Sequence, residues 1–221
     1  MFNTPFAFMA AVASPIPQDG LVLAVDANDP ACYPGTGTVV TDLSPYANTG
    51  TFTDPSFSSN TFIFNTSPGN NILFGAGAQY GFSGTWSYVI YFNPTDSGSS
   101  YMAEKSTGID QGSLVYGYNG EACRPWNGNY NGMNPVSAPV GEWAFIVFTK
   151  AANGVANNYK SYKNGVLVQE LSSDFSFSAG TNGFRINVSS QDAGNFQMKN
   201  FYCYNRALTA AEVTDIYNFV I

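Results

Sequence analysis

The sequence predicts an all-β fold, a sandwich of short antiparallel strands. Its 221 residues are only 10% charged but 16% aromatic, and they include 22 glycines. Few charges with many aromatic, glycine and turn-forming residues favour short strands over a helical protein. The length fits one large β domain as well as two small ones. Because we find no linker and no internal repeat, we expect one domain over residues 19–221, preceded by an arm over residues 1–18.

The stretch from Gly141 to Leu171 carries the clearest strand pattern. Residues 143–149 are apolar and aromatic, and residues 159–168 alternate before returning to Val-Leu-Val. Asn164-Gly165 is a dipeptide that favours a tight hairpin turn. We therefore predict two or three antiparallel strands here. Both alternating sets of the first strand are apolar, which indicates burial on both of its faces.

Further strands are expected on both sides of this stretch. In the best-patterned one, Trp86, Tyr88, Ile90 and Phe92 share a face. Residues 33–60 are expected to form loop with one or two edge strands, and residues 119–139 are the most loop-like part of the domain. The other predicted strands are Leu21–Val25, Thr61–Phe64, Asn71–Phe74, Thr85–Phe92, Tyr101–Lys105, Ser113–Tyr118, Phe184–Val188 and Phe196–Tyr204.

One helix is predicted, at the C-terminus. Thr209 and Glu212 have the spacing of a capping box, in which the Thr oxygen accepts a backbone N–H and the Glu reaches back. The apolar residues that follow recur at helical spacing and should lie on the sandwich: Val213, Ile216, Tyr217 and Val220.

Residues 1–18 differ from the rest of the chain. They carry no charged side chain but have Phe2, Phe6, Phe8 and Met9. One interpretation is a secretory signal, since an apolar run precedes small residues at 11–13, but the positively charged start of such signals is missing. We favour an assembly arm whose apolar side chains are buried against the domain, a sister subunit or another protein.

The charge distribution argues against nucleic-acid binding. The net charge is −7, and no Lys or Arg precedes Lys105. A basic surface for phosphates is therefore missing from the first half and sparse in the second. No segment is long and apolar enough to span a bilayer, so no membrane partner is expected.

No catalytic set is apparent, so we predict that the protein is not an enzyme. The chain has no histidine, which excludes His general bases and Ser-His-Asp catalysis. Its glutamates are far apart, without the paired carboxylates that glycoside hydrolysis needs, although a pair built across strands remains an alternative. The three cysteines lack short spacings and are interpreted as isolated buried residues, with a single disulfide bridge as the alternative.

Carbohydrate binding is the better candidate. Sugars are held by an aromatic platform with amide and charged side chains. The Gly- and Asn-rich loop over residues 119–134 supplies such a set, and Trp126 would be hard to bury in such a loop. Trp86 and Trp143, in contrast, lie in strand patterns and are assigned to the core. The alternative is a loop packed on its own sandwich or on a neighbour. The candidate residues are Trp126, Tyr130, Asn127, Asn129 and Arg124.

Four motifs carry a family resemblance. Trp143 opens a strand that is followed by Tyr-Lys-Asn-Gly at 162–165, and residues 204–208 read Tyr-Asn-Arg-Ala-Leu just before the capping box. Tyr-Pro-Gly-Thr-Gly at 33–37 and Thr-Asp-Leu-Ser at 41–44 stand near the start. Together they resemble laminin G-like domains of the concanavalin A-like lectin/glucanase superfamily. The resemblance implies a two-sheet antiparallel jelly-roll sandwich with one short C-terminal helix.

The resemblance also implies a role. The first-loop motifs are similar to those of laminin G-like domains in virion proteins of tailed bacteriophages. This implies a non-enzymatic virion structural protein, a capsid decoration or a fibre or adhesin component, located in the virion. Its residues 1–18 would contact other virion proteins or copies of itself, and it would bind host or environmental glycans. The alternative is a secreted or cell-surface lectin-like module that binds carbohydrate.

No cofactor is expected. Some laminin G-like domains hold calcium between loops, but no dense Asp-x-Asp run supports such a site in this sequence. Asp26, Asp29 and Asp42 are interpreted as solvated, loop-capping residues.

Overall fold

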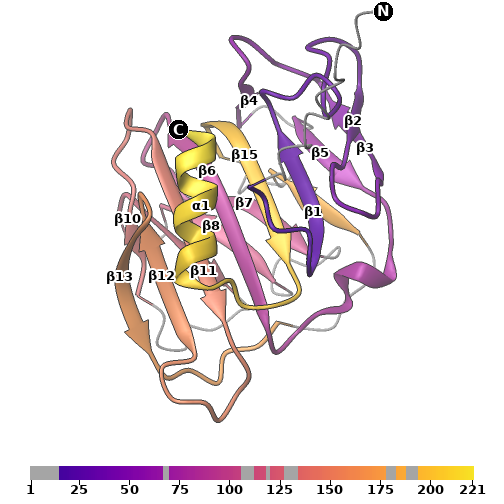
Figure 1. Ribbon diagram of the computed structural model, residues 1–221. Helices are drawn as coiled ribbons and strands as arrows, with labels where there is room; N and C mark the ends of the chain where they lie inside the picture. The colour runs from indigo at the N-terminus through magenta and orange to yellow at the C-terminus, as the bar shows by residue number, and fades with distance from the viewer. Residues whose placement is uncertain are drawn as a thin grey trace, which may run out of the picture.

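Two antiparallel sheets packed face to face form the body of the computed structural model (Figure 1). The structure describes residues 15–66, 70–105, 112–117, 120–126, 134–177, 183–187 and 194–221. The predicted all-β sandwich is confirmed.

Sheet A consists of seven strands. They are β1 Leu21–Asp26, β4 Phe62–Phe64, β6 Trp86–Pro94, β11 Ala144–Lys150, β12 Tyr159–Lys163, β13 Val166–Leu171 and β15 Phe196–Tyr204. Their order is β1-β15-β6-β11-β12-β13, with β4 also paired to β15. Strands distant in sequence, β15 and β6, are therefore neighbours in the interior of the sheet.

Sheet B consists of eight strands. They are β2 Val39–Thr41, β3 Thr49–Thr53, β5 Asn71–Phe74, β7 Ser100–Lys105, β8 Ser113–Tyr116, β9 Ala122–Trp126, β10 Val136–Ser137 and β14 Phe184–Ile186. Their order is β10-β9-β8-β7-β14-β5-β3-β2. The expectation of one or two edge strands within residues 33–60 is confirmed by β2, at the sheet edge, and by β3 beside it.

The main core lies between the sheets and is strongly aromatic. On β6, the four residues predicted to share a face, Trp86, Tyr88, Ile90 and Phe92, are all buried in this core. The Trp86 ring stacks on Phe177 at 4.5 Å between centroids. Offset-stacked and edge-to-face aromatic pairs add stability beyond the area that they bury.

Strand β11 is buried on both faces, as its sequence predicts. Ile146 and Phe148 belong to the core between the sheets, whereas Phe145 and Val147 belong to a second apolar cluster on the outer face of sheet A. Helix α1, Ala210–Val220, covers that outer face through Val213, Ile216 and Val220, with Tyr217 partly buried. Figure 1 shows the helix lying across β6 and β11.

The helix begins at the predicted capping box. Thr209 Oγ1 accepts the backbone N–H of Glu212, and the Glu212 carboxylate accepts the N–H of Thr209. Arg206 Nη2 also donates to Glu212 Oε1 at 2.6 Å, and this bond, ahead of the capping contacts, lowers the pKa of Glu212 to about 2. Arg206 also forms an ion pair with the Asp19 carboxylate and donates a hydrogen bond to the Asp19 carbonyl. One side chain therefore connects the start of the helix to the residues before β1.

The hairpin between β12 and β13 turns at Asn164-Gly165, as predicted. Both residues have positive φ, 50° and 78°, which matches the two central positions of a tight hairpin turn. A Cβ on Gly165 would lie 2.8 Å from Tyr217 Cδ1 on α1. The turn is therefore fixed both by backbone conformation and by close approach to the helix.

Part of the predicted loop over residues 119–139 is strand instead. Residues 122–126 form β9 and residues 136–137 form β10, because β9 pairs with β8 and β10 pairs in turn with β9. The polar composition of this stretch is typical of a loop, so the sequence did not indicate the strand pairing. Of the predicted arm, Phe2, Phe6, Phe8 and Met9 lie outside the described residues, while Ile16 packs into the outer cluster of sheet A.

The three cysteines are free and buried, as predicted. Burial raises the pKa of Cys32 to about 12 and that of Cys123 still further. Within the described ranges, no three Cys, Asp or Glu side chains come together in a group able to hold a metal ion. No helix in those ranges is long and apolar enough to cross a membrane.

Candidate functional site

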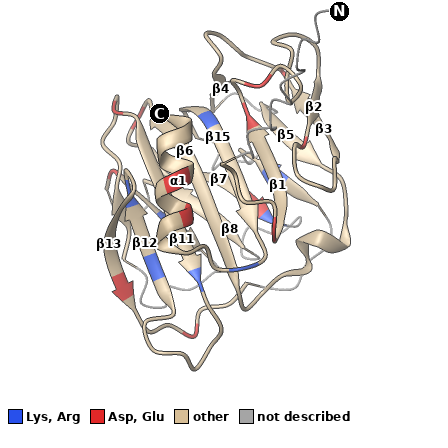
Figure 2. Cartoon of the chain, viewed as in Figure 1, with Lys and Arg blue, Asp and Glu red and all other residues tan. Residues whose placement is uncertain are grey.

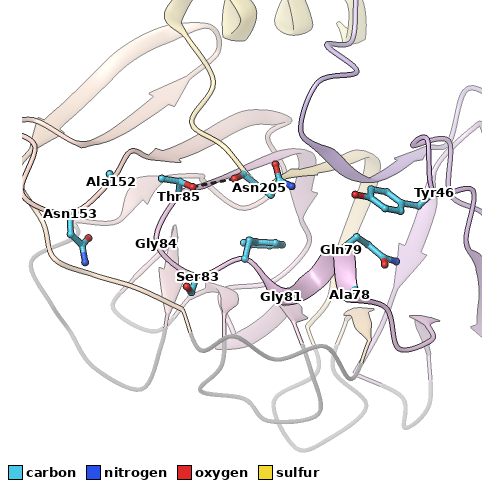
Figure 3. Close-up of a pocket in the computed structure, with 11 residues that line it drawn as sticks. Tyr46, Ala78, Gln79, Gly81, Ser83, Gly84, Thr85, Ala152, Asn153 and Asn205 are labelled. Atoms are coloured by element: carbon cyan, nitrogen blue, oxygen red, sulfur yellow. Dashed lines mark hydrogen bonds between the residues drawn. The ribbon is translucent and has the colours of Figure 1, made fainter.

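A pocket opens at one end of the sandwich, where four segments of the chain meet. It has a volume of about 760 Å³. One wall comes from the 3₁₀ helix η1, Ala78–Gly81, and the residues that lead from it into β6. Figure 3 shows Tyr46 and Gln79 at one end of the pocket, Asn153 at the other, and Thr85 with Asn205 between them.

Two buried aromatic residues fix the wall that leads into β6. Tyr80 within η1 and Trp86 at the start of β6 are both fully buried. The residues between these anchors, 81–85, are only partly buried and line the pocket. The two anchors are only six residues apart, so the short segment between them is held at both ends.

Tyr46 is placed by a turn built on Asp42. Asp42 Oδ1 accepts the backbone N–H groups of Ala24 and Ser44, each at 2.8 Å, and Asp42 Oδ2 accepts Asn48 Nδ2 at 2.9 Å. Asp42 is 1% exposed, whereas Tyr46 is 50% exposed. The interpretation of Asp42 as a loop cap is confirmed, but its expected solvation, like that of Asp26, is wrong because both residues are buried. The loop that Asp42 caps presents an aromatic ring to solvent.

Asp26 and Asp29 have the same role in the first loop. Asp26 Oδ1 accepts the N–H of Asn28, and Asp29 Oδ1 accepts the N–H of Ala31. Burial raises the pKa of Asp26 despite this bond. Both are local caps of the kind that Asp provides in turns.

Two buried lysines each donate a hydrogen bond to a residue that lines the pocket. Lys105 Nζ donates to the carbonyl of Phe82 and lies 4.4 Å from the centroid of its ring. Lys150 Nζ donates to Asn153 Oδ1 at 2.6 Å. Burial lowers the pKa of Lys105 to about 8 and also lowers that of Lys150. Each amine thus fixes a lining residue without presenting its charge to the pocket.

The described lining is uncharged and chemically mixed. It consists of two aromatic side chains, three amides, two hydroxyls, and small residues: Tyr46, Phe82, Gln79, Asn153, Asn205, Ser83, Thr85, Ala78, Gly81, Gly84 and Ala152. Thr85 Oγ1 donates to the Asn205 carbonyl at 3.2 Å, while Asn153 Nδ2 donates to Ser176. Aromatic faces and neutral hydrogen-bonding groups suit an uncharged, hydroxyl-rich ligand.

The residues predicted from the sequence as a sugar site lie elsewhere. Trp126 and Arg124 are alternate residues of β9, 9% and 6% exposed, with the guanidinium carbon 5.3 Å from the Trp126 ring centroid. The expectation that Trp126 is hard to bury is wrong, because β9 lies inside sheet B rather than in a loop. Asn127, Asn129 and Tyr130 lie outside the described residues, so glycan binding by this set stays a prediction.

The assignment of Trp143 to the core is also wrong. It stands just before β11, is partly exposed, and contacts Tyr91 at 5.0 Å between ring centroids. The alternation of side chains along β11 could have indicated this position. Trp143 is two residues before Phe145 and four before Val147, so it shares their face, which points away from the other sheet. Trp86, by contrast, is a core residue as predicted.

Sequence reasoning missed the pocket because its residues come from distant parts of the chain. Tyr46, Gln79, Asn153 and Asn205 belong to four separate segments of the chain that no local motif connects. The available signals were the Thr-Asp-Leu-Ser turn before Tyr46 and the glycines between Tyr80 and Trp86. Neither indicates a ligand without the fold.

Solved structures with this architecture include both enzymes and toxin domains. Trypanosoma rangeli sialidase matches with a TM-score of 0.62 and 16% identity over 91% of this chain. The botulinum neurotoxin serotype D binding domain matches with a TM-score of 0.64 and 12% identity, also over 91%. This chain spans 33% of the sialidase chain and 51% of the toxin domain. At these identities the likeness concerns the fold alone.

The sequence comparison is more specific. No curated protein matches this chain significantly in sequence. Residues 67–214, well over half of the chain, match the laminin G-type profile described as concanavalin A-like lectin/glucanases superfamily. The matched region runs from just before β5 into helix α1, so it includes most of both sheets and the wall of the pocket that leads into β6. The chain therefore belongs to the concanavalin A-like lectin/glucanase superfamily.

Proposed function

We propose that this domain is a carbohydrate-binding module that holds a neutral glycan in the pocket at the end of the sandwich. The observation that carries the proposal is the combination of exposed Tyr46 with an uncharged rim of amides and hydroxyls. Tyr46 offers an apolar face to a sugar ring, and Gln79, Asn153 and Asn205 offer donors and acceptors to its hydroxyls.

We also propose that the domain binds without hydrolysing its ligand. Hydrolysis of a glycosidic bond requires an acid and a second carboxylate on either side of it. The described lining of the pocket contains no Asp or Glu. This agrees with the wide separation of the glutamates along the sequence.

Glycan binding is tested by replacing the aromatic platform. A glycan array identifies a neutral ligand for the intact chain, and calorimetry then measures its Kd for Tyr46→Ala. We expect a loss of about tenfold or more, typical of truncating an aromatic anchor. Phe219→Ala is the matched control, since Phe219 is 51% exposed but lies outside this pocket. Equal affinity of the Tyr46 variant and the intact chain would contradict glycan binding in this pocket. Release of reducing sugar from the bound glycan would contradict the non-enzymatic role.

A second proposal concerns the setting in which the domain works. We propose a virion structural protein, a capsid decoration or a fibre or adhesin component, attached through residues 1–18 to other virion proteins or to copies of itself. The uncharged, Phe-containing sequence of these residues supports it. Ile16 belongs to the outer apolar cluster of sheet A, which also contains Val213, Ile216 and Val220 of α1. A secreted or surface lectin-like module is the alternative setting.

The arm is tested by native mass spectrometry of the full chain and of a variant with Phe2, Phe6 and Phe8 replaced by serine. We expect the full chain to form oligomers and the variant to be monomeric, because the apolar side chains would drive association. Keeping Ile16 in both preserves its contacts with the domain. Two well-behaved monomers would contradict self-assembly through the arm and favour the lectin-like alternative.

A further inference from the structure

A second pocket lies on the outer face of sheet A and shares no residue with the first. It has a volume of about 350 Å³. Trp143 and Lys199 form one side, and Ser58, Ser59 and Thr61 come from the segment before β4, with Ile63 and Gln197 completing the lining. We refer to these seven residues as the Trp143 pocket.

The outer face of sheet A is covered by α1 only in part. Helix residues pack over Val89, Phe145 and Val147. Trp143 and Lys199 are on the same outer face but remain partly exposed. Tyr91 connects the two regions, since it packs at the edge of the cluster beneath α1 and contacts Trp143. The pocket is thus an aromatic surface left open beside the helix.

Lys199 places a positive charge over this surface. Its Nζ lies 5.0 Å from the Trp143 ring centroid and 5.7 Å from that of Tyr91, within the range of cation–π interactions. Two rings therefore hold the ammonium in position before any ligand arrives. Lys199 is the only basic residue of β15, which Figure 2 shows as a blue segment of that strand.

No carboxylate neutralises this charge within the described ranges. The ion pairs found there use Lys160, Arg185 and Arg206, although acidic residues outnumber basic ones by 15 to 8. An ammonium has three donors, so Lys199 can stay over the rings and still donate to an anion. A half-buried, unpaired cation on an aromatic wall is suited to a ligand with one negative charge and an apolar face.

The remaining lining groups indicate what else the ligand carries. Ser58 and Ser59 expose hydroxyls, and Gln197 adds an amide. These groups hydrogen-bond neutral hydroxyls in either direction. Phosphate sites usually combine several cationic or N–H donors, from arginines, lysines or a helix N-terminus, whereas the described lining offers one lysine alone.

We propose that the Trp143 pocket binds an acidic sugar, a pyranose that carries a carboxylate. Trp143 lies against the apolar face of the ring, Lys199 donates to the carboxylate, and Ser58, Ser59 and Gln197 bond the hydroxyls. This site is independent of the neutral-glycan pocket, so the domain has two sugar sites of different charge preference.

The proposal is tested by calorimetry with three acidic ligands: tetragalacturonate, a hyaluronan tetrasaccharide and sialyllactose. Each is compared with its methyl ester, which keeps the ring and removes the charge. We expect at least one acid to bind with a Kd below about 1 mM and its ester to bind about tenfold or more weakly, because a charge-assisted bond is lost.

Variants then assign the binding to this pocket. Lys199→Gln should abolish the preference for acid over ester, and Trp143→Ala should weaken both forms. Lys163→Gln is the matched control, since Lys163 is a partly exposed lysine outside this pocket. Tyr46→Ala should leave acid binding unchanged, so failure of the neutral pocket is distinguished from failure of this one. Circular dichroism confirms that each variant folds.

Three results would overturn the proposal. These are absence of binding by all three acids, equal affinity for acid and ester, or an unchanged preference in folded Lys199→Gln.

Discussion

Replacing Trp86 by alanine is expected to lower the free energy of unfolding by about 3–5 kcal/mol, the range for truncating a large core aromatic. Trp86 is fully buried and contacts four aromatic rings: Tyr88, Tyr159, Phe175 and Phe177. The cavity would open where β6, β12 and the segment before β14 meet, so the surrounding rings could collapse only partly. Chemical denaturation followed by circular dichroism measures the change.

Trp143→Ala is the matched control for this experiment. It removes the same side chain from a partly exposed position, where Tyr91 is the one aromatic neighbour among the described residues. Its effect on the unfolding free energy should be much smaller, because the cost follows burial and cavity formation. Similar losses for the two variants would contradict the placement of Trp86 in the main core.

Replacing Asp42 by alanine is expected to cost about 2–3 kcal/mol of stability and to weaken neutral-glycan binding. The substitution leaves the buried N–H groups of Ala24 and Ser44 and the Asn48 amide without their acceptor. Bonds to a charged group contribute about 1.5–3 kcal/mol, and unsatisfied buried donors add a further cost. Because the turn holds Tyr46, its loosening should raise the Kd for the glycan in calorimetry.

Asp29→Ala separates this effect from the general cost of losing a loop cap. Asp29 is only partly buried and caps a single N–H, that of Ala31. We expect a loss of about 1 kcal/mol or less and no change in glycan binding. If Asp42→Ala lowered stability but left the Kd unchanged, Tyr46 would not depend on the Asp42 turn.

The glycan effect of Asp42 can also be assigned through a double-mutant cycle. If Asp42 acts on binding only through the position of Tyr46, Asp42→Ala should add nothing to the Kd change of Tyr46→Ala. Coupled residues deviate from additivity in this way, whereas independent ones do not. Additive Kd changes would show that Asp42 affects the pocket by another route.

The sequence by itself determined the fold class and most strands. Strict alternation in β6 assigned Trp86 and Tyr88 to one face, and two apolar sets in β11 indicated burial on both faces. Capping-box spacing at Thr209 and Glu212 located the helix, and Asn164-Gly165 located a hairpin turn. These signals are local: each depends on residues a few positions apart, whose relation is set by strand or helix geometry.

Only the tertiary structure decided where the exposed aromatic rings lie. Trp126 looks like a loop residue in a run of Gly and Asn, yet pairing with β8 makes it part of a strand and buries it. Trp143 looks like a core residue, yet α1 covers the sheet beside it and leaves it open. Side-chain exposure depends on which distant segment packs on a face, and this information is absent from local sequence. The pocket at the end of the sandwich has the same origin, because Tyr46, Gln79, Asn153 and Asn205 meet only when both sheets are assembled.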